Sequence, residues 1–485
     1  MQLKDQGLFH TKCYIDGDWV DAESGEVIEV TNPANGEVLG TVPKMGAEET
    51  RRAIEAAGAA WPAWRKLTGK DRSKVLRRWY DLMLENVDDL AKIMTLEQGK
   101  PLAESKGEIH YASWFVEWFA EEAKRAYGEV IPQTLPDRRI VVVKEPIGVA
   151  AAITPWNFPS AMITRKAAPA LAAGCPVVIK PASATPFSAL ALAELADRAG
   201  FPKGVVNLVT GSATAIGGEL TGNPIVRKLS FTGSTEIGKV LMAQCAKTVK
   251  KVSLELGGNA PLIVFDDADI EQAIAGAMAS KYRNTGQTCV CANRILVQDS
   301  IYEDFAARLG AEVAKLKVGE GMSEGVQQGP LINMAAVAKV EEHISDAVAK
   351  GAKVALGGAR HALGGQFFQP TVLTGVTPEM RIAHEETFGP VAPLFRFTTE
   401  DEAIEMANNT PYGLAAYFFS RDIGRIWRVA EALEYGMVGI NEGILSTEVA
   451  PFGGVKESGI GREGAHDGLE EYLETKYMLM GAIDK

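Results

Sequence analysis

The segment KLSFTGSTEIGKVLMAQCAKTVKKVSLEL, residues 228–256, places a helical pattern over 235–246 between two short apolar runs, KLSF and VSLEL. A strand, a helix and a second strand within about 30 residues form the crossover unit of a parallel sheet. Working outward, the same alternation runs from 149 to 320: VAAAIT, helix 160–173, PVVIKP, helix 186–199, VVNLVT, helix 212–220, PLIVF, helix 269–283 and RILVQ. The pattern predicts an α/β fold with a mostly parallel sheet and functional residues at the carboxyl ends of its strands.

Helical periodicity covers residues 47–127, and strands begin at about 138, in RRIVVVKEPIGVAAAIT. A second α/β pattern continues after 326, and the chain ends in the strand-like YLETKYMLMGAI. No short repeat, low-complexity tract or long charged linker marks a boundary. At roughly 150 residues per domain, 485 residues predict about three domains with soft boundaries.

Composition excludes several classes of protein. With 46% hydrophobic and 23% charged residues, the chain is neither disordered nor collagenous. A net charge of −12 would repel nucleic acid and anionic membrane surfaces. The longest apolar stretch, between Lys166 and Lys180, has 13 residues and is too short to span a bilayer. The N-terminal MQLKDQGLFHTK lacks the apolar run of a secretion signal, so we expect a cytoplasmic protein.

Three glycine or hydroxyl-rich turns are candidates for binding phosphate. The literal G-x-G-x-x-G at Gly459, Gly461 and Gly464 follows no strand, so we interpret it as loop glycine. The turn Phe231–Ser234 joins a strand to a helix whose N-terminus favours a diphosphate, although ordinary turns of this kind are commoner. Lys180 and Ser183 follow strand VVI and could hold a ribose or its phosphate, unless Ser183 only begins a turn.

A cysteine gives the stronger chemical signal. Five cysteines with no C-x-x-C or ligand-like spacing predict neither a disulfide framework nor a metal site. Cys289 lies in NTGQTCVCANR just beyond Lys281 and Arg283, where we expect an exposed, activated thiol. Glu255 ends an apolar strand, so burial should raise its pKa and suit it to general-base work, unless it is a paired structural carboxylate. Asn157 in TPWNFP offers amide N–H groups to an oxyanion, or merely shapes a turn.

Together these segments resemble the aldehyde dehydrogenase superfamily. TPWNFP, VIKPAS, FTGSTEIG, LELGG, GQTCVC, EETFGPV and PFGGVKESGIGRE follow one another in the order and approximate spacing of that family, over nearly the whole chain. The resemblance implies the aldehyde dehydrogenase fold, in which an atypical Rossmann-type cofactor domain is joined to an α/β catalytic domain and a small oligomerisation element. The implied divisions are 1–127 with 147–257 for the cofactor, 258–457 for catalysis, and 128–146 with 458–485 for oligomerisation as a dimer or tetramer.

The resemblance also implies residue roles. Cys289 would be the nucleophile, Glu255 the base that activates water, and Asn157 the oxyanion donor together with the Cys289 backbone N–H. The aldehyde would form a thiohemiacetal and then a thioester on Cys289, and no metal is required. The implied cofactor-site residues are Trp156, Lys180, Ser183, Gly233, Ser234, Leu256 and Glu386. NAD-preferring members commonly carry a glutamate at the position of Ser183; a serine there, near Lys180, favours NADP, with NAD as the alternative.

Within the superfamily the chain resembles the succinate-semialdehyde dehydrogenases, through PWNFPSAMITRKAAPALAAGCPVVIKPAS, YRNTGQTCVCANR and EVAPFGGVKESGIGREG. Arg165, Arg283 and Ser446 stand where that group binds the distal carboxylate of its substrate. Arg165 lies in an apolar helix, where a positive charge requires an anionic partner. Arg283 could instead interact with the negative end of a helix dipole at a helix C-terminus. Cys291, in the Cys-x-Cys motif, is implied to resolve oxidised Cys289 as a disulfide, unless it only fills space.

Several alternatives remain at this stage. Succinate and glutarate semialdehydes differ by one methylene, which a pocket discriminates by only about 1 to 3 kcal/mol. A coenzyme-A-acylating dehydrogenase is disfavoured because Glu255 is present. A non-catalytic binding protein on the same fold is disfavoured because Cys289, Glu255 and Asn157 occur together.

Overall fold

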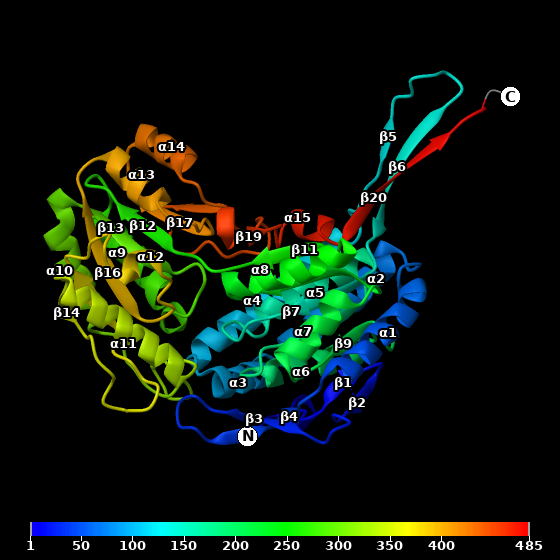
Figure 1. Cartoon of the computed structure of the whole chain (residues 1–485), viewed down its shortest axis with the longest axis horizontal. Coiled ribbons are helices and arrows are strands. Elements are labelled where there is room, and N and C mark those ends of the chain that lie inside the picture. The colour runs from blue at the N-terminus through cyan, green and yellow to red at the C-terminus, as the bar shows by residue number, and fades with distance from the viewer. Residues whose placement is uncertain (1, 484–485) are drawn as a thin grey trace.

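A computed structural model describes residues 2–483. Met1, the first residue of the expected cofactor domain, and residues 484–485, the last two of the expected oligomerisation element, lie outside the described residues. Two large sheets dominate the molecule, and a three-stranded sheet projects from it (Figure 1). The α/β class predicted from the alternation is confirmed.

The first sheet has the strand order β19-β11-β10-β7-β8-β9-β1-β2. Its five central strands run parallel, while β19, β1 and β2 pair antiparallel at the two edges. The bounds are β1 Cys13–Ile15, β2 Asp18–Val20, β7 Val149–Ile153, β8 Val177–Lys180, β9 Val206–Leu208, β10 Val226–Thr232, β11 Lys251–Glu255 and β19 Gly459–Ile460.

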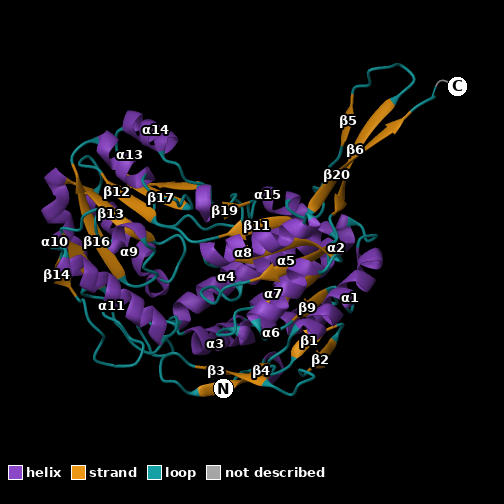
Figure 2. Cartoon of the chain, viewed as in Figure 1, coloured by secondary structure: helices purple, strands orange, loops and turns teal. Residues whose placement is uncertain are grey.

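Helices cover both faces of this sheet (Figure 2). Alternate residues of β7 show why, because Ala150 and Ala152 belong to one apolar cluster and Val149 and Ala151 to another. One layer contains α2 Gly69–Glu85, α3 Val87–Gln98, α4 Leu102–Glu122, α5 Ala161–Ala173 and α6 Pro186–Ala199; the other contains α1 Ala47–Trp64, α7 Ala213–Gly222 and α8 Thr235–Cys245. These bounds match the helices predicted from the sequence to within a few residues.

The second sheet has the order β14-β15-β16-β13-β12-β17-β18 and is parallel except for β14. Its strands are β12 Ala260–Val264, β13 Ala292–Gln298, β14 Lys353–Leu356, β15 Thr371–Thr374, β16 Val391–Phe397, β17 Ala415–Phe419 and β18 Met437–Ile440. Its helices are α9 Ile270–Tyr282, α10 Tyr302–Val313, α11 Met334–Ala349, α12 Arg381–His384, α13 Glu400–Asn408 and α14 Ile423–Ala432; α15 Asp467–Glu470 follows β19.

The projecting sheet has the order β20-β6-β5. β20 (Leu473–Met480) pairs antiparallel with β6 (Arg139–Pro146) along eight residues, and β5 (Glu129–Ile131) lies on the other side of β6. Tyr477, Met478, Leu479 and Met480 are exposed there. Two further strands, β3 Val27–Thr31 and β4 Val38–Pro43, form a separate pair.

The glycines of the literal G-x-G-x-x-G do not form a phosphate loop. Gly459 begins the edge strand β19, and a Cβ there would lie 1.9 Å from the Leu254 carbonyl oxygen. All three glycines have positive φ, of +143°, +89° and +74°. Glycine is therefore required at position 459, because the backbone of β11 lies too close for a side chain.

Candidate active site

The carboxyl ends of four neighbouring strands meet at one edge of the first sheet. Ile153 pairs with Lys180 and with Phe231, and Thr232 pairs with Glu255. A cavity of about 260 Å³ opens beside this edge. It is lined by Pro155, Trp156, Asn157, Thr232, Gly233, Ser234, Leu256, Gly257, Cys289, Lys339, Glu386 and Phe388. The structure thus brings Cys289 and Asn157 together with five of the residues expected to hold a cofactor.

The floor of this cavity is a turn that presents two N–H donors beside the thiol. The Asn157 side-chain amide donates one hydrogen to the Gln287 carbonyl at 3.1 Å, which leaves its second hydrogen free. The backbone N–H of Cys289 has no hydrogen-bond acceptor within residues 2–483. Lys100 and Asn284 both donate to the Asn157 carbonyl, at 2.6 and 3.0 Å, and fix its backbone. Two such donors next to a nucleophile are what an oxyanion needs.

The segment that delivers Cys289 is held in an unusual conformation. Asn284 and Thr285 have φ of 49° and 56°, and Gly286 follows at +74°. A Cβ on Gly286 would lie 2.2 Å from the Gly389 carbonyl oxygen. Left-handed residues other than glycine cost free energy and concentrate at functional sites. The hydrogen bond from Cys291 N–H to the Thr288 carbonyl, 3.2 Å, then closes a turn that contains Cys289.

Cys289 is half-exposed, as its loop position predicted, but it is not activated in this arrangement. Burial of its thiol and, second, the negative charge of Glu386 raise its pKa to about 12. The two cations that we expected to help lie elsewhere: Arg283 stacks over Phe158 at 4.9 Å, and Lys281 contacts Cys291. The expectation of a preformed thiolate is therefore wrong, because charges close in sequence diverge at the end of α9.

Glu255 has the environment that the sequence predicted. It is buried at the end of β11, and desolvation, followed by the charge of Glu463, raises its pKa well above the ordinary value. Its Oε2 has no hydrogen-bond partner. The carboxylate lies behind Leu256 and Gly257 and does not itself line the cavity. Such a carboxyl group can accept a proton but must first move or meet a water molecule.

Glu386 and two residues that the sequence did not single out form the opposite wall. Glu386 accepts a hydrogen bond from Gly258 N–H at 3.3 Å, and burial raises its pKa to about 7. Phe388 packs edge-on against Trp156 with ring centroids 5.5 Å apart, and Lys339 enters from α11. Phe388 lies in the EETFGPV segment but was given no role, and no local motif marks Lys339, which only the folded chain brings to the cavity.

Lys180 and Ser183 do not line this cavity. Lys180 is buried at the end of β8, and desolvation lowers its pKa. Its ammonium group donates to the Pro181 carbonyl at 3.1 Å and has no carboxylate partner within residues 2–483. Ser183 is exposed in the turn that precedes α6. A buried lysine without a counter-charge fits an anionic ligand at the same sheet edge.

Arg165 has an internal anionic partner. On α5, Arg165 and Lys166 both form ion pairs with the buried carboxylate of Glu463, and Lys166 also donates to Thr232 Oγ1 at 2.6 Å. The Arg165 guanidinium lies 4.0 Å from the Phe452 ring centroid, while its Nη2 has no hydrogen-bond partner. The sequence predicted that Arg165 needs an anion, but Glu463, 298 residues later in the PFGGVKESGIGRE segment, was not identified as that partner.

Tyr111 on α4 was missed by the sequence analysis. Its hydroxyl is buried without a hydrogen-bond partner, even though the Ser446 side chain faces it. Burial raises its pKa, whereas Arg165, Arg283 and Ser446 oppose that rise. Arg165, Arg283 and Ser446 therefore lie near the Tyr111 hydroxyl, and two buried polar atoms here, Tyr111 Oη and Arg165 Nη2, have no hydrogen-bond partner. Buried polar atoms are normally satisfied, so these two are available to a ligand.

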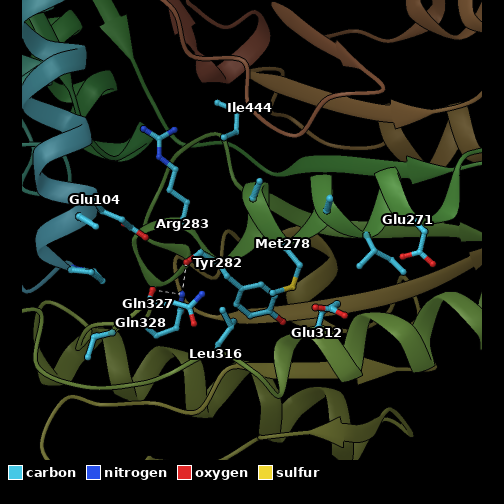
Figure 3. A pocket seen from close by; sticks show the side chains of 16 residues that line it. Glu104, Glu271, Met278, Tyr282, Arg283, Glu312, Leu316, Gln327, Gln328 and Ile444 are labelled. Carbon is cyan, nitrogen blue, oxygen red and sulfur yellow. Dashed lines mark hydrogen bonds between the residues drawn. The ribbon is translucent and has the colours of Figure 1, made fainter. Parts of the chain in front are cut away.

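Arg283 also borders a larger hollow of about 800 Å³ (Figure 3). In Figure 3 its side chain leaves the end of α9 next to Glu104, and Tyr282 and Met278 line the same hollow. Ile444, two residues before Ser446, closes one end of it. Cys289 does not line this hollow, which shares no lining residue with the 260 Å³ cavity.

Residues 2–483 contain no group of three or more His, Cys, Asp or Glu side chains arranged to hold a metal ion. Within the same residues, no helix has both the length and the apolar character needed to cross a bilayer.

Comparison with known proteins gives consistent matches over the full chain. The model of the aldehyde dehydrogenase family matches residues 19–478. Glutarate-semialdehyde dehydrogenase of Pseudomonas aeruginosa is 67% identical over 483 residues, with all of both chains covered. NADP(+) succinate-semialdehyde dehydrogenase of Escherichia coli is 66% identical, covering 99% of this chain and 100% of the relative. The crystal structure of succinate-semialdehyde dehydrogenase from Burkholderia pseudomallei is 65% identical with a TM-score of 0.99, covering 99% of this chain and 100% of that one.

Proposed function

Because the chain belongs to the aldehyde dehydrogenase family, we propose that it oxidises a small anionic semialdehyde to the dicarboxylate with reduction of NADP. The observation that carries the substrate class is the pair of unpartnered polar atoms, Arg165 Nη2 and Tyr111 Oη; Arg165 lies near both Tyr111 and Cys289. A distal carboxylate supplies both with a charge-assisted partner. The names of the two relatives, glutarate- and succinate-semialdehyde dehydrogenase, agree with such a substrate.

In this proposal the thiolate of Cys289 attacks the aldehyde carbon and forms a thiohemiacetal. The free hydrogen of the Asn157 amide and the Cys289 backbone N–H hold the oxyanion. The residues that line the 260 Å³ cavity would hold a nicotinamide cofactor, which would supply the hydride acceptor, while Cys289 would carry the product as a thioester. Division into two half-reactions makes each step easier than direct oxidation by water.

Protons in this scheme are handled by Glu255. Its raised pKa makes it a competent acceptor for the proton of water that attacks the thioester. The pKa of about 12 for Cys289 shows that the thiol needs help to ionise. Protonation of Glu386, or binding of the positively charged nicotinamide ring in the cavity, would lower the pKa of Cys289 and so favour its thiolate. Glu386 therefore regulates the nucleophile electrostatically as well as lining the cofactor site.

Preference for NADP rests on charge at the end of β8. The cavity residues fit a dinucleotide, because Gly233 and Ser234 form the N-terminus of α8, where free N–H groups and the helix dipole favour a diphosphate. Lys180 is a buried cation without a carboxylate, and Ser183 adds no negative charge. A 2′-phosphate is therefore tolerated and attracted there, while NAD also fits.

Substrate length is decided by the volume among Tyr111, Arg165, Arg283 and Ser446. We place succinate semialdehyde first and glutarate semialdehyde second, since one methylene changes binding by only about 1 to 3 kcal/mol. The deciding experiment compares kcat/KM for these two aldehydes and for butanal, which lacks the carboxylate. The proposal requires butanal to be the poorest substrate by at least about tenfold, the equivalent of 1.4 kcal/mol. Equal values for butanal and both semialdehydes would refute an anionic specificity.

Two further proposals concern assembly and regulation. The projecting sheet, with exposed Tyr477, Met478, Leu479 and Met480, fits the contact surface of a homodimer or homotetramer. Cys291 remains a candidate for resolving oxidised Cys289 as a disulfide. In an extended loop, a disulfide between residues two positions apart would be strained. Cys289 and Cys291 instead belong to a turn closed by the hydrogen bond from Cys291 N–H to the Thr288 carbonyl. The domain divisions given above stay a prediction.

A further inference from the structure

Lys100 and Glu108 form a buried ion pair beside the turn that carries Asn157. Their side chains are 0% and 1% exposed, and Lys100 Nζ donates to Glu108 Oε2 at 2.5 Å. The same ammonium group donates to the Asn157 carbonyl at 2.6 Å and lies 4.0 Å from the centroid of the Phe158 ring. A carboxylate, a carbonyl and an aromatic face all attract positive charge, so the surroundings of Nζ fit an ammonium group. No step of the proposed reaction assigns a role to this pair.

Glu108 joins the pair to the first turn of α5. Its Oε1 accepts hydrogen bonds from the backbone N–H groups of Ser160 and Ala161, at 2.9 and 3.2 Å. A carboxylate is favoured there by the free N–H groups and the dipole of the helix N-terminus. Burial lowers the pKa of Lys100, and the charge of Glu108 opposes that decrease. The charge of Lys100 is therefore compensated by a group that is itself anchored to backbone three residues beyond Asn157.

The loop that follows α9 is held to the same carbonyl. Glu104, one turn before Glu108 on α4, accepts the backbone N–H of Asn284 at 2.8 Å. The Asn284 side chain donates to the Asn157 carbonyl at 3.0 Å and accepts from Gln98 at 3.1 Å. The Asn157 carbonyl thus accepts two hydrogen bonds from groups that are held in place by α4 and its preceding turn, and one of these donors carries a full positive charge.

The peptide group after Asn157 connects its carbonyl to its own side chain. The N–H of that peptide belongs to Phe158 and donates to Asn157 Oδ1 at 3.1 Å. The Asn157 Nδ2 group then carries the hydrogen that we assign to the oxyanion. Hydrogen bonds in series polarise one another, so an amide that accepts at its oxygen donates more strongly from its nitrogen. A chain of this kind runs from the Lys100 ammonium group to the Asn157 side-chain N–H.

We propose that Lys100 is a positioning residue for the oxyanion: its charge, held by Glu108, fixes the Asn157 turn and strengthens the Asn157 side-chain N–H as a donor. The inference rests on the proposed role of Asn157 and goes beyond it, because neither Lys100 nor Glu108 lines the 260 Å³ cavity. The proton of Lys100 stays on its nitrogen throughout. Negative charge on oxygen develops as the thiolate attacks, so Lys100 acts on that step and not on cofactor binding.

The first experiment is a double-mutant cycle that needs no cofactor. The thiolate of Cys289 attacks the carbonyl carbon of p-nitrophenyl acetate, p-nitrophenolate leaves, and the absorbance burst measures this acylation. Lys100→Met should slow the burst by at least about tenfold, and Asn157→Ala should slow it by roughly 100-fold. Because Lys100 acts through Asn157, the double variant should match Asn157→Ala within about twofold. Effects that multiply in the double variant, or an unchanged burst in Lys100→Met, would overturn the proposal.

Two further variants separate this role from a general loss of stability. Lys228→Met is the matched control, because it removes another buried lysine, which pairs with Glu471 at 2.8 Å. It should lower Tm and leave the burst unchanged. Lys100→Met/Glu108→Gln leaves no uncompensated carboxylate in the interior, so it carries the test if Lys100→Met does not fold. A full burst rate in this folded variant would overturn the proposal.

The dehydrogenase assay distinguishes failure of this inference from failure of the proposed function. With semialdehyde, Lys100→Met should slow single-turnover reduction of the cofactor and leave the KM for NADP within about twofold of the parent value. A raised KM for NADP with an unchanged single-turnover rate would overturn the positioning role. If the parent shows an Asn157-dependent burst but oxidises no semialdehyde, the proposed function fails and the role of Lys100 stands on the cycle. A parent without an Asn157-dependent burst would overturn the inference.

Discussion

Replacing Tyr111 with phenylalanine tests the substrate class in the most direct way. The substitution removes one hydroxyl group and leaves the ring, which packs edge-on against Phe115 with centroids 5.0 Å apart. That hydroxyl is buried and has no well-formed hydrogen bond, so its removal affects only the approach of the Ser446 side chain. Tyr111→Phe should consequently lower kcat/KM without lowering the free energy of unfolding.

The magnitudes follow from the two environments of the hydroxyl. An unsatisfied buried polar group costs about 1–3 kcal/mol, so Tyr111→Phe should leave the free energy of unfolding unchanged or raise it by up to that amount. With the semialdehyde bound, the same hydroxyl donates to a carboxylate, an interaction that contributes about 1.5–3 kcal/mol. Its loss corresponds to a decrease of roughly 13- to 160-fold in kcat/KM.

The assay compares steady-state kcat/KM for succinate semialdehyde and butanal with unfolding monitored by denaturant titration. Tyr302→Phe is the matched control, because the Tyr302 hydroxyl donates to the Leu394 carbonyl at 3.0 Å and accepts from Gly375 N–H at 2.9 Å. That control should lower the unfolding free energy and leave substrate discrimination intact. If Tyr111→Phe lowers kcat/KM equally for butanal and the semialdehyde, Tyr111 does not recognise the carboxylate and the reasoning is refuted.

Three further predictions concern the reacting groups and the cofactor. Glu255→Gln should keep the single-turnover burst of cofactor reduction while steady-state turnover falls, because only thioester hydrolysis needs the base. Loss of the burst in a folded protein would contradict this prediction, and Cys289→Ala is the inactive control. Ser183→Glu should lower the NADP-to-NAD ratio of kcat/KM by at least about tenfold through repulsion of the 2′-phosphate, and an unchanged ratio in kinetic assays would exclude Ser183 from cofactor selection. Burial raises the pKa of Glu386 to about 7, so ionisation of this group destabilises the folded protein as pH rises from the pKa of the unfolded state toward 7. Glu386→Gln should therefore raise Tm at pH 8 and change it much less at pH 5. An equal gain in Tm at both pH values would refute the assigned ionisation.

The sequence predicted those parts of the molecule that depend on neighbouring residues. Alternating apolar runs and helical patterns gave the strands and helices of the first sheet, since periodicity directly reflects which face is buried. Asn157 and Gly233 could be placed at the same edge because each follows a parallel strand. Cys289 joined them only through the resemblance to a family, as it comes from a loop between α9 and the second sheet.

Contacts between distant segments were beyond the sequence. Glu463 contacts Arg165 from the PFGGVKESGIGRE segment, and Tyr111 lies near Arg165 on a long helix; the sequence identified neither residue as a neighbour of Arg165. Lys281 and Arg283 both precede Cys289 by a few residues, yet α9 ends between them and they contact different partners. Charge proximity along a chain therefore says little about the pKa of a thiol.

The shared carboxylate of Glu463 limits how this enzyme could be redesigned. Arg165 and Lys166 bring two positive charges into the interior, Glu463 supplies one negative charge, and the raised pKa of Glu255 favours its neutral form. With Glu255 neutral, the group formed by Arg165, Lys166 and Glu463 carries one surplus positive charge, which the anionic aldehyde that we propose would balance. An engineer who replaces Arg165 with an apolar residue, to admit neutral aldehydes, also changes the charge that faces the base. Substrate charge and the pH range of thioester hydrolysis would shift together, so adapting the site requires compensating changes at both groups.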